Sequence, residues 1–111
     1  MQDLTITQVD NTKSLFTPLG SRIRILLKEN PTTGYRWKLH KYDSGIIRLQ
    51  SDEFVAQQGT LIGGSGIRQL CFLAATVGRA TIELRTMREW EKPESVLDTF
   101  VITINVERNI P

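Results

Sequence analysis

Apolar and polar residues alternate along most of this chain with a period of two, and this pattern constrains the fold more than any other feature. Between Arg22 and Lys28, the residues Ile23, Ile25 and Leu27 fall on one face of an extended strand, and the basic residues fall on the other. The alternation recurs at Tyr35, Trp37 and Leu39, at Leu70, Phe72 and Ala74, at Ala80, Ile82 and Leu84, and at Phe100, Ile102, Ile104 and Val106. Less regular strands are expected at residues 4–9 and 46–55. The spacing typical of an amphipathic helix is missing from the sequence, so we expect almost no helix.

Short strands with one apolar face each are typical of two antiparallel sheets packed face to face. We therefore predict an all-β fold, an immunoglobulin-like antiparallel β-sandwich of about seven strands. It would occupy residues 1–111 as a single domain, and a small barrel is the alternative. Cys71 is the one cysteine in the sequence, so the prediction includes no disulfide between the sheets.

Composition and charge argue against several classes of function. Fourteen Lys and Arg against twelve Asp and Glu give a formal charge of +2, without a basic run that could follow a phosphate backbone, so we expect no nucleic acid partner. No segment approaches the roughly 20 apolar residues that cross a bilayer, and the first residues lack the pattern of a secretory signal. We expect no membrane partner and either a cytoplasmic protein or a processed form from a secretory or lysosomal route. One cysteine and one histidine fall short of a zinc ligand set, so we expect no metal and no cofactor.

Three connections carry unusual residues, and the predicted topology places them together. When the expected strands are lettered A to G in chain order, the B–C, D–E and F–G connections emerge at one end of the sandwich. They contain the sequences NPTTG at 30–34, LIGGSGIR at 61–68 and MREWEKPES at 87–95. This coincidence favours a binding surface over three unrelated turns.

The first of these connections is stiffened by its own sequence. Asn30 precedes a proline and is pushed toward an extended conformation, and Pro31 fixes its own φ. Gly34 can supply the positive φ that ends the loop. Thr32 and Thr33 lie at the tip as small β-branched residues with restricted side-chain torsions. Taken alone, this stretch is also consistent with a plain turn.

The second and third connections each allow two interpretations. Gly63, Gly64 and Gly66 leave the backbone bare, which lets a partner surface approach closely or simply makes the connection flexible. Trp90 is surrounded by charged residues, and Trp and Arg are enriched among binding hot spots. It either projects from the loop toward a partner or folds back onto its own domain.

Cys71 and His40 are the candidate nucleophile and base of a possible enzyme. A nucleophile and a base of this kind must converge on one face and be oriented by a third group. Each of these residues falls on the polar parity of its strand, next to apolar neighbours. The sequence favours a surface histidine and a packed or half-exposed thiol, and we predict that the protein is not an enzyme.

These three loops, in this order and in this kind of sandwich, resemble the chagasin-type inhibitors of papain-like cysteine peptidases. The resemblance runs from about the second strand to the last, and its most specific element is NPTTGYRW at residues 30–37. Two positions depart from the family pattern. Ser65 stands where Gly-x-Gly-Gly has its second glycine, and Glu89 replaces the proline of Arg-Pro-Trp.

The resemblance implies a tight-binding, reversible, non-covalent inhibitor that wedges the three loops along the peptidase active-site cleft and needs only a monomer to do so. Thr32 and its neighbours would lie over the catalytic Cys/His pair, with residues 63–67 on one side and Arg88 and Trp90 on the other. The peptidase-binding residues implied in this way are Asn30, Pro31, Thr32, Thr33, Gly34, Tyr35, Gly63, Gly64, Ser65, Gly66, Ile67, Arg88 and Trp90. The competing hypothesis is a non-inhibitory immunoglobulin-like module that recognises a carbohydrate or a receptor.

Overall fold

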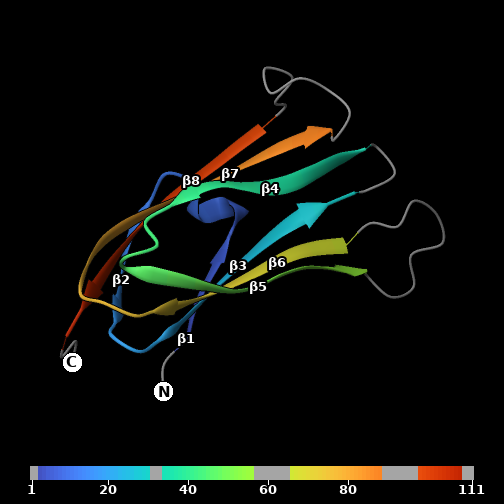
Figure 1. The fold of residues 1–111 in the computed structure, drawn as a ribbon. Coiled ribbons are helices and arrows are strands. Elements are labelled where there is room, and N and C mark those ends of the chain that lie inside the picture. The colour runs from blue at the N-terminus through green and yellow to red at the C-terminus, as the bar shows by residue number, and fades with distance from the viewer. Residues whose placement is uncertain (1–2, 31–33, 57–65, 89–97, 109–111) are drawn as a thin grey trace.

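The fold is a sandwich of two four-stranded β-sheets, shown in Figure 1. The computed structural model describes residues 3–30, 34–56, 66–88 and 98–108. One sheet has the strand order β1-β3-β6-β5 and the other has the order β2-β8-β7-β4. The predicted all-β sandwich is therefore confirmed, and the separation into two sheets argues against the barrel alternative.

The strands follow the alternating segments of the sequence. Their bounds are β1 Asp3–Thr7, β2 Ser14–Pro18, β3 Arg22–Glu29, β4 Tyr35–Tyr42, β5 Ile47–Ala56, β6 Gly66–Ala74, β7 Gly78–Arg88 and β8 Asp98–Glu107. A single 3-10 turn, η1, spans Gln8–Asp10 between β1 and β2 in the described part of the chain. Helix is therefore nearly absent from these residues, as expected.

The core lies between the two sheets and consists of the inward positions that the alternation predicts. Its buried residues are Ile6, Ile23, Ile25, Leu27, Trp37, Ile47, Leu70, Phe72, Ala74, Ala80, Ile82, Leu84, Phe100, Ile102, Ile104 and Val106. Most of these side chains are aliphatic and β-branched or γ-branched, so they fill the space between two pleated surfaces in well-defined rotamers. Burial of this apolar area is the main source of stability in a fold that is not cross-linked through its cysteine.

The N-terminal region differs in detail from the prediction. The expected strand at 4–9 ends at Thr7, and a further strand, β2, follows η1 and adds to the opposite sheet. Both β1–β3 and β2–β8 are parallel pairs, whereas the other pairs are antiparallel. β2 was not expected because its apolar and polar positions are reversed: the aromatic Phe16 is exposed and the polar Thr17 is buried.

Candidate functional site

The strand ends that border the three unusual connections lie at one end of the sandwich (Figure 1). β3 ends at Glu29 and β4 begins at Tyr35, β5 ends at Ala56 and β6 begins at Gly66, and β7 ends at Arg88 before β8 begins at Asp98. Register brings these ends together, because Gly66 pairs with both Glu29 and Ala56 and Tyr35 pairs with Arg88. The expected clustering of the three connections at one end is confirmed at the level of these strand ends.

Several predicted site residues lie outside the described residues. They are Pro31, Thr32, Thr33, Gly63, Gly64, Ser65 and Trp90. The structure does describe Asn30, Gly34, Tyr35, Gly66, Ile67 and Arg88, all of which lie at the strand ends or within one residue of them. The site can therefore be built from its base, where each connection leaves and re-enters the sheets.

Gly34 has the backbone conformation that the sequence predicts. Its φ is +83°, in the left-handed region that costs other residues about 1–2 kcal/mol. The next residue, Tyr35, begins β4. Glycine at this position therefore directs the chain into β4.

Tyr35 and Arg88 connect the base of the first connection to the base of the third. The guanidinium carbon of Arg88 lies 4.4 Å from the centroid of the Tyr35 ring, within the range of a cation–π contact. The two residues are also register partners in the β4–β7 ladder. Arg88 was predicted to contact the peptidase, and within the described structure its cationic group stacks on a residue of the NPTTGYRW stretch.

Gly66 has a packing role at the base of the second connection. It is buried, and a Cβ at this position would collide with the backbone oxygen of Val55 and lie 2.6 Å from Cζ of Phe54. Its neighbour Ile67 is half-buried and pairs with Lys28 and Val55. The sequence interpretation placed Gly66 among the bare backbone positions, whereas the structure explains this glycine by the close approach of β5.

We expect Gly66→Ala to lower the free energy of unfolding by about 1–3 kcal/mol, because the added methyl group overpacks the β5–β6 contact. Urea denaturation measures this change. Gly45→Ala is the matched control, since nothing lies within 4 Å of a Cβ at Gly45, and its effect should stay below about 1 kcal/mol. Equal effects of the two substitutions would contradict the packing role.

Glu29 is the central polar residue of this end, and it was not among the residues predicted from the sequence. It continues the inward parity of Ile23, Ile25 and Leu27 by one step, and its side chain is only 1% exposed. Its Oε1 accepts hydrogen bonds from the backbone N–H of Trp37 at 2.6 Å and from Nε of Arg68 at 3.2 Å. A charged residue at a fourth inward position is the signal that could have identified it, because a buried carboxylate requires partners.

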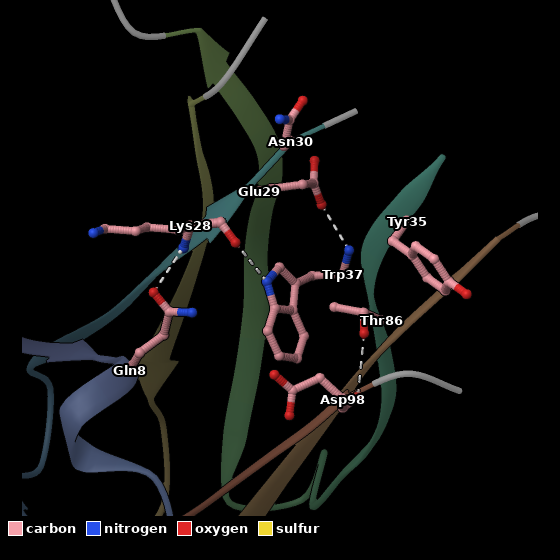
Figure 2. Close-up of a pocket in the computed structure, with 8 residues that line it drawn as sticks. All are labelled: Gln8, Lys28, Glu29, Asn30, Tyr35, Trp37, Thr86 and Asp98. Carbon is pink, nitrogen blue, oxygen red and sulfur yellow. Dashed lines mark hydrogen bonds between the residues drawn. The ribbon is translucent and has the colours of Figure 1, made fainter. Parts of the chain in front are cut away.

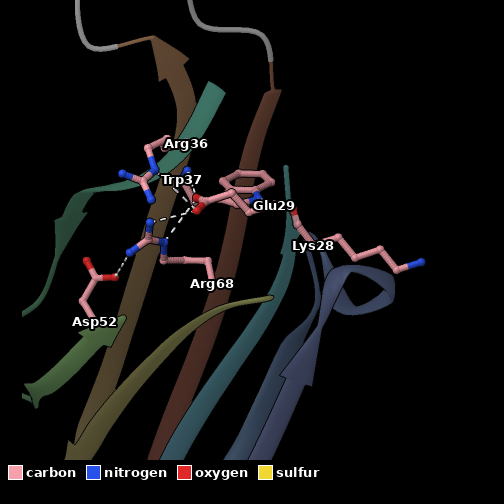
Figure 3. Close-up of polar contacts among 6 residues, drawn as sticks. All are labelled: Lys28, Glu29, Arg36, Trp37, Asp52 and Arg68. Carbon is pink, nitrogen blue, oxygen red and sulfur yellow. Dashed lines mark hydrogen bonds and ion pairs between the residues drawn. The ribbon is translucent and has the colours of Figure 1, made fainter. Parts of the chain in front are cut away.

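Arg68 is the main partner of Glu29 and also lies on the inward parity of its strand, two residues before Leu70. Its Nη2 donates to Glu29 Oε2 at 2.8 Å and its Nη1 donates to Asp52 Oδ1 at 3.2 Å (Figure 3). Burial by itself would lower the pKa of Arg68, but the hydrogen bond and charge of Glu29, followed by the charge of Asp52, outweigh burial and raise that pKa above its ordinary value. The guanidinium of Arg68 therefore stays charged at every pH at which the protein is folded.

Trp37 joins the two sheets beneath the first connection. Its indole Nε1 donates a hydrogen bond to the backbone oxygen of Lys28 at 2.9 Å, and its backbone N–H donates to Glu29. β3 and β4 belong to different sheets, so these two bonds close the sandwich where the chain crosses from one sheet to the other. The second aromatic residue of NPTTGYRW is thus an internal anchor, and it keeps the two ends of the connection at a fixed separation.

A shallow pocket lies between the bases of the first and third connections (Figure 2). Its lining residues are Gln8, Lys28, Glu29, Asn30, Tyr35, Trp37, Thr86 and Asp98. Its volume of about 150 Å³ is below the 300–1,000 Å³ that is usual for small-molecule sites. Hydrogen bonds link its lining residues in pairs, since Gln8 Oε1 accepts from the Lys28 N–H and the Thr86 hydroxyl donates to the Asp98 carbonyl. This geometry is better suited to supporting the loops than to enclosing a ligand.

Comparison with known proteins decides between the candidate classes of function. The family model described as "Chagasin family peptidase inhibitor I42" matches residues 17–104, which is most of the chain. The chain belongs to the chagasin family. Among its relatives, amoebiasin-2 from Entamoeba histolytica is 28% identical over 101 residues, covering 89% of this chain and 81% of amoebiasin-2. Chagasin from Trypanosoma cruzi is 24% identical over 105 residues, covering 87% of this chain and 92% of chagasin.

The solved structures agree with this assignment to the chagasin family. The crystal structure of the cysteine protease inhibitor EhICP2 from Entamoeba histolytica superposes with a TM-score of 0.85 at 26% sequence identity. The match covers 95% of this chain and 96% of that one. The family resemblance drawn from the NPTTGYRW stretch is therefore confirmed, together with the sandwich fold.

The enzyme hypothesis does not fit this chagasin-family chain. Cys71 lies on β6 in one sheet, whereas His40 lies on β4 in the other sheet. Cys71 is on the parity opposite to the buried Leu70 and Phe72, and the exposed His40 lines a surface pocket beside Lys38 and Arg85. The two side chains therefore do not converge on one face, which a nucleophile and its base require.

The described part of the chain contains neither a metal-ligand cluster nor a membrane-spanning helix. No group of three or more His, Cys, Asp or Glu side chains is placed there to hold a metal ion. The same residues include no helix with the length and apolar character needed to span a membrane.

Proposed function

We propose that this protein is a tight-binding, reversible and non-covalent inhibitor of papain-like cysteine peptidases, which occludes the active-site cleft with the three connections at the end of the sandwich described above. The observation that carries the proposal is the convergence of the six bordering strand ends in a chain of the chagasin family. EhICP2, which this chain resembles in fold and sequence, is a cysteine protease inhibitor.

The chemistry of the target explains why a stiff loop suffices. A papain-like peptidase activates a cysteine thiolate by pairing it with a histidine. A narrow loop placed over this pair would exclude both water and substrate from the thiolate. We expect Thr32 and Thr33 to fill this position, with the glycine segment supplying main-chain hydrogen bonds beside it.

Preorganisation at the base of the loops supports tight binding. The first connection is held by Trp37 and Glu29, the second by Arg68, and the third by the contact of Arg88 with Tyr35. A segment whose ends are fixed before docking loses less conformational entropy when it binds. We expect the interface to bury about 800 Å² per partner, as in other protease–inhibitor complexes.

The proposed non-covalent mode can be tested on the complex itself. Papain and the protein, mixed in equal amounts, should elute together from a gel-filtration column as a one-to-one complex. After the complex is dissociated in denaturant, both chains should have their original masses, because no bond is formed or cleaved. A mass increase on the papain chain, or cleavage of the partner, would contradict a reversible plug.

Trp90→Ala should weaken inhibition of papain by about 1–3 kcal/mol, the size expected when a hot-spot aromatic is truncated. The inhibition constant measures this loss. Phe16→Ala is the matched control, because Phe16 is another aromatic residue, is 61% exposed and lies on β2 opposite Asn105, away from the loop end. An unchanged constant for Trp90→Ala would reject the anchoring role of Trp90.

A further inference from the structure

We propose that Glu29 and Arg68 act as positioning residues, a buried ion pair that sets the position of the first connection relative to the second. The inference rests on the proposed function and deepens it, because it identifies what holds two of the three loops in a binding arrangement. Neither residue is expected to touch the peptidase. Each would act through the strands that it joins.

The pair connects the four strands that border the two connections (Figure 3). Glu29 ends β3 and binds the backbone N–H of Trp37 on β4, so it spans the two sides of the first connection. Arg68 lies two residues inside β6 and binds Asp52 on β5, so it spans the two strands that border the second. The 2.8 Å bond between Arg68 Nη2 and Glu29 Oε2 then joins the two halves.

The energetics of buried charge favour a positioning role over a purely stabilising one. The side chains of Glu29 and Arg68 are 1% and 12% exposed, and removing two charges from water costs several kcal/mol per ion. Well-packed apolar residues at such positions often stabilise a fold at least as much as a buried ion pair does. Both residues continue rows of inward apolar side chains, so an apolar pair would simply extend the core. An ion pair adds direction, because its hydrogen bonds are satisfied in one arrangement of the strands.

Arg36, within the NPTTGYRW stretch, faces the same carboxylate. Its Nε is 3.7 Å from Glu29 Oε2. This Nε is buried, and among the described residues it has no hydrogen-bond partner. Glu29 therefore attracts a second cation by charge, from the strand that leaves the first connection. Two arginines, Arg36 and Arg68, therefore interact with the same buried carboxylate.

The test separates positioning from stability by using two variants. Arg68→Met removes the guanidinium and leaves the Glu29 carboxylate buried without its main partner. The double variant Glu29→Gln with Arg68→Met also removes that charge, while the Gln oxygen can still accept the Trp37 N–H. Melting temperature and the inhibition constant for papain are measured for both variants and for the unaltered protein.

We expect Arg68→Met to lower the melting temperature and to weaken inhibition by about tenfold, as expected if loop side chains must be ordered anew on docking. In the double variant most of the lost melting temperature should return, because the buried carboxylate without its main partner is gone and Arg36, whose side chain is 38% exposed, keeps its charge in contact with solvent. Inhibition should stay about tenfold weaker, because the two connections are no longer joined.

Arg85→Met is the matched control. It breaks a guanidinium–carboxylate contact of the same 2.8 Å length, but its partner Glu83 lies on the same strand, so the pair joins no two connections. It should leave the inhibition constant unchanged.

Each of the remaining outcomes decides against a stated idea. If inhibition recovers together with melting temperature in the double variant, or is unchanged in Arg68→Met, the positioning role is overturned. If the unaltered protein fails to inhibit papain and a cathepsin L-like enzyme, the proposed function fails, and this inference fails with it. Inhibition by the unaltered protein thus distinguishes the two failures.

Discussion

Replacing Trp37 with alanine is expected to lower the free energy of unfolding by about 3–5 kcal/mol, as for other buried tryptophans. The side chain is 4% exposed and belongs to the core between the sheets. Its removal leaves a cavity and deprives the Lys28 carbonyl of the indole donor that closes the first connection. Urea denaturation followed by circular dichroism measures the loss.

Trp37→Phe is the control that separates bulk from hydrogen bonding. It keeps most of the apolar volume and removes the Nε1 donor, so the expected loss from the hydrogen bond itself is about 1 kcal/mol. If Trp37→Ala cost less than Trp37→Phe, or if both were neutral, the indole would not be the anchor that joins β3 to β4.

Deleting Thr32 and Thr33 together should weaken inhibition of papain by more than about 2 kcal/mol, the threshold of a hot spot. The proposed wedge depends on the length and stiffness of the tip, and the shortened connection cannot reach the catalytic pair. Because the anchors of this connection, Glu29 and Trp37, remain in place, the melting temperature should change little. Steady-state inhibition and a thermal melt of the same preparation measure both quantities.

A variant with serine at both threonine positions is the control for this deletion. It keeps the length of the tip and both hydroxyl groups and removes two methyl groups, so most of the inhibition should remain. Normal inhibition by the deletion variant would show that the tip does not enter the cleft.

The sequence predicts the central strands well because their alternation is regular. Ile23, Ile25 and Leu27 repeat without a break, and the structure buries all three. The parity argument fails for β2, where Phe16 faces solvent and Thr17 is buried beside Ser21, with their hydroxyl oxygens 2.6 Å apart. From residue type alone, Thr17 and Ser21 would be placed on the surface. The parallel β2–β8 pairing was therefore not predicted.

The place of the candidate site was predictable, whereas its supporting chemistry was not. Strand order alone brings three connections to one end, and Gly34 adopts the positive φ that its position in the motif requires. The roles of Glu29, Arg68 and Gly66 depend on which strands are neighbours. Glu29 meets Arg68 because β3 pairs with β6, and Gly66 must be small because β5 lies against it. Such contacts between distant segments are not encoded in any local pattern.

The proposed inhibition is tested first by titrating active papain, and a cathepsin L-like enzyme, with increasing amounts of the protein while hydrolysis of a fluorogenic peptide is followed. We expect activity to be lost at close to one molecule of protein per active site, with trypsin unaffected in a parallel titration. Full papain and cathepsin L-like activity in a micromolar excess of folded protein would contradict the proposed inhibition.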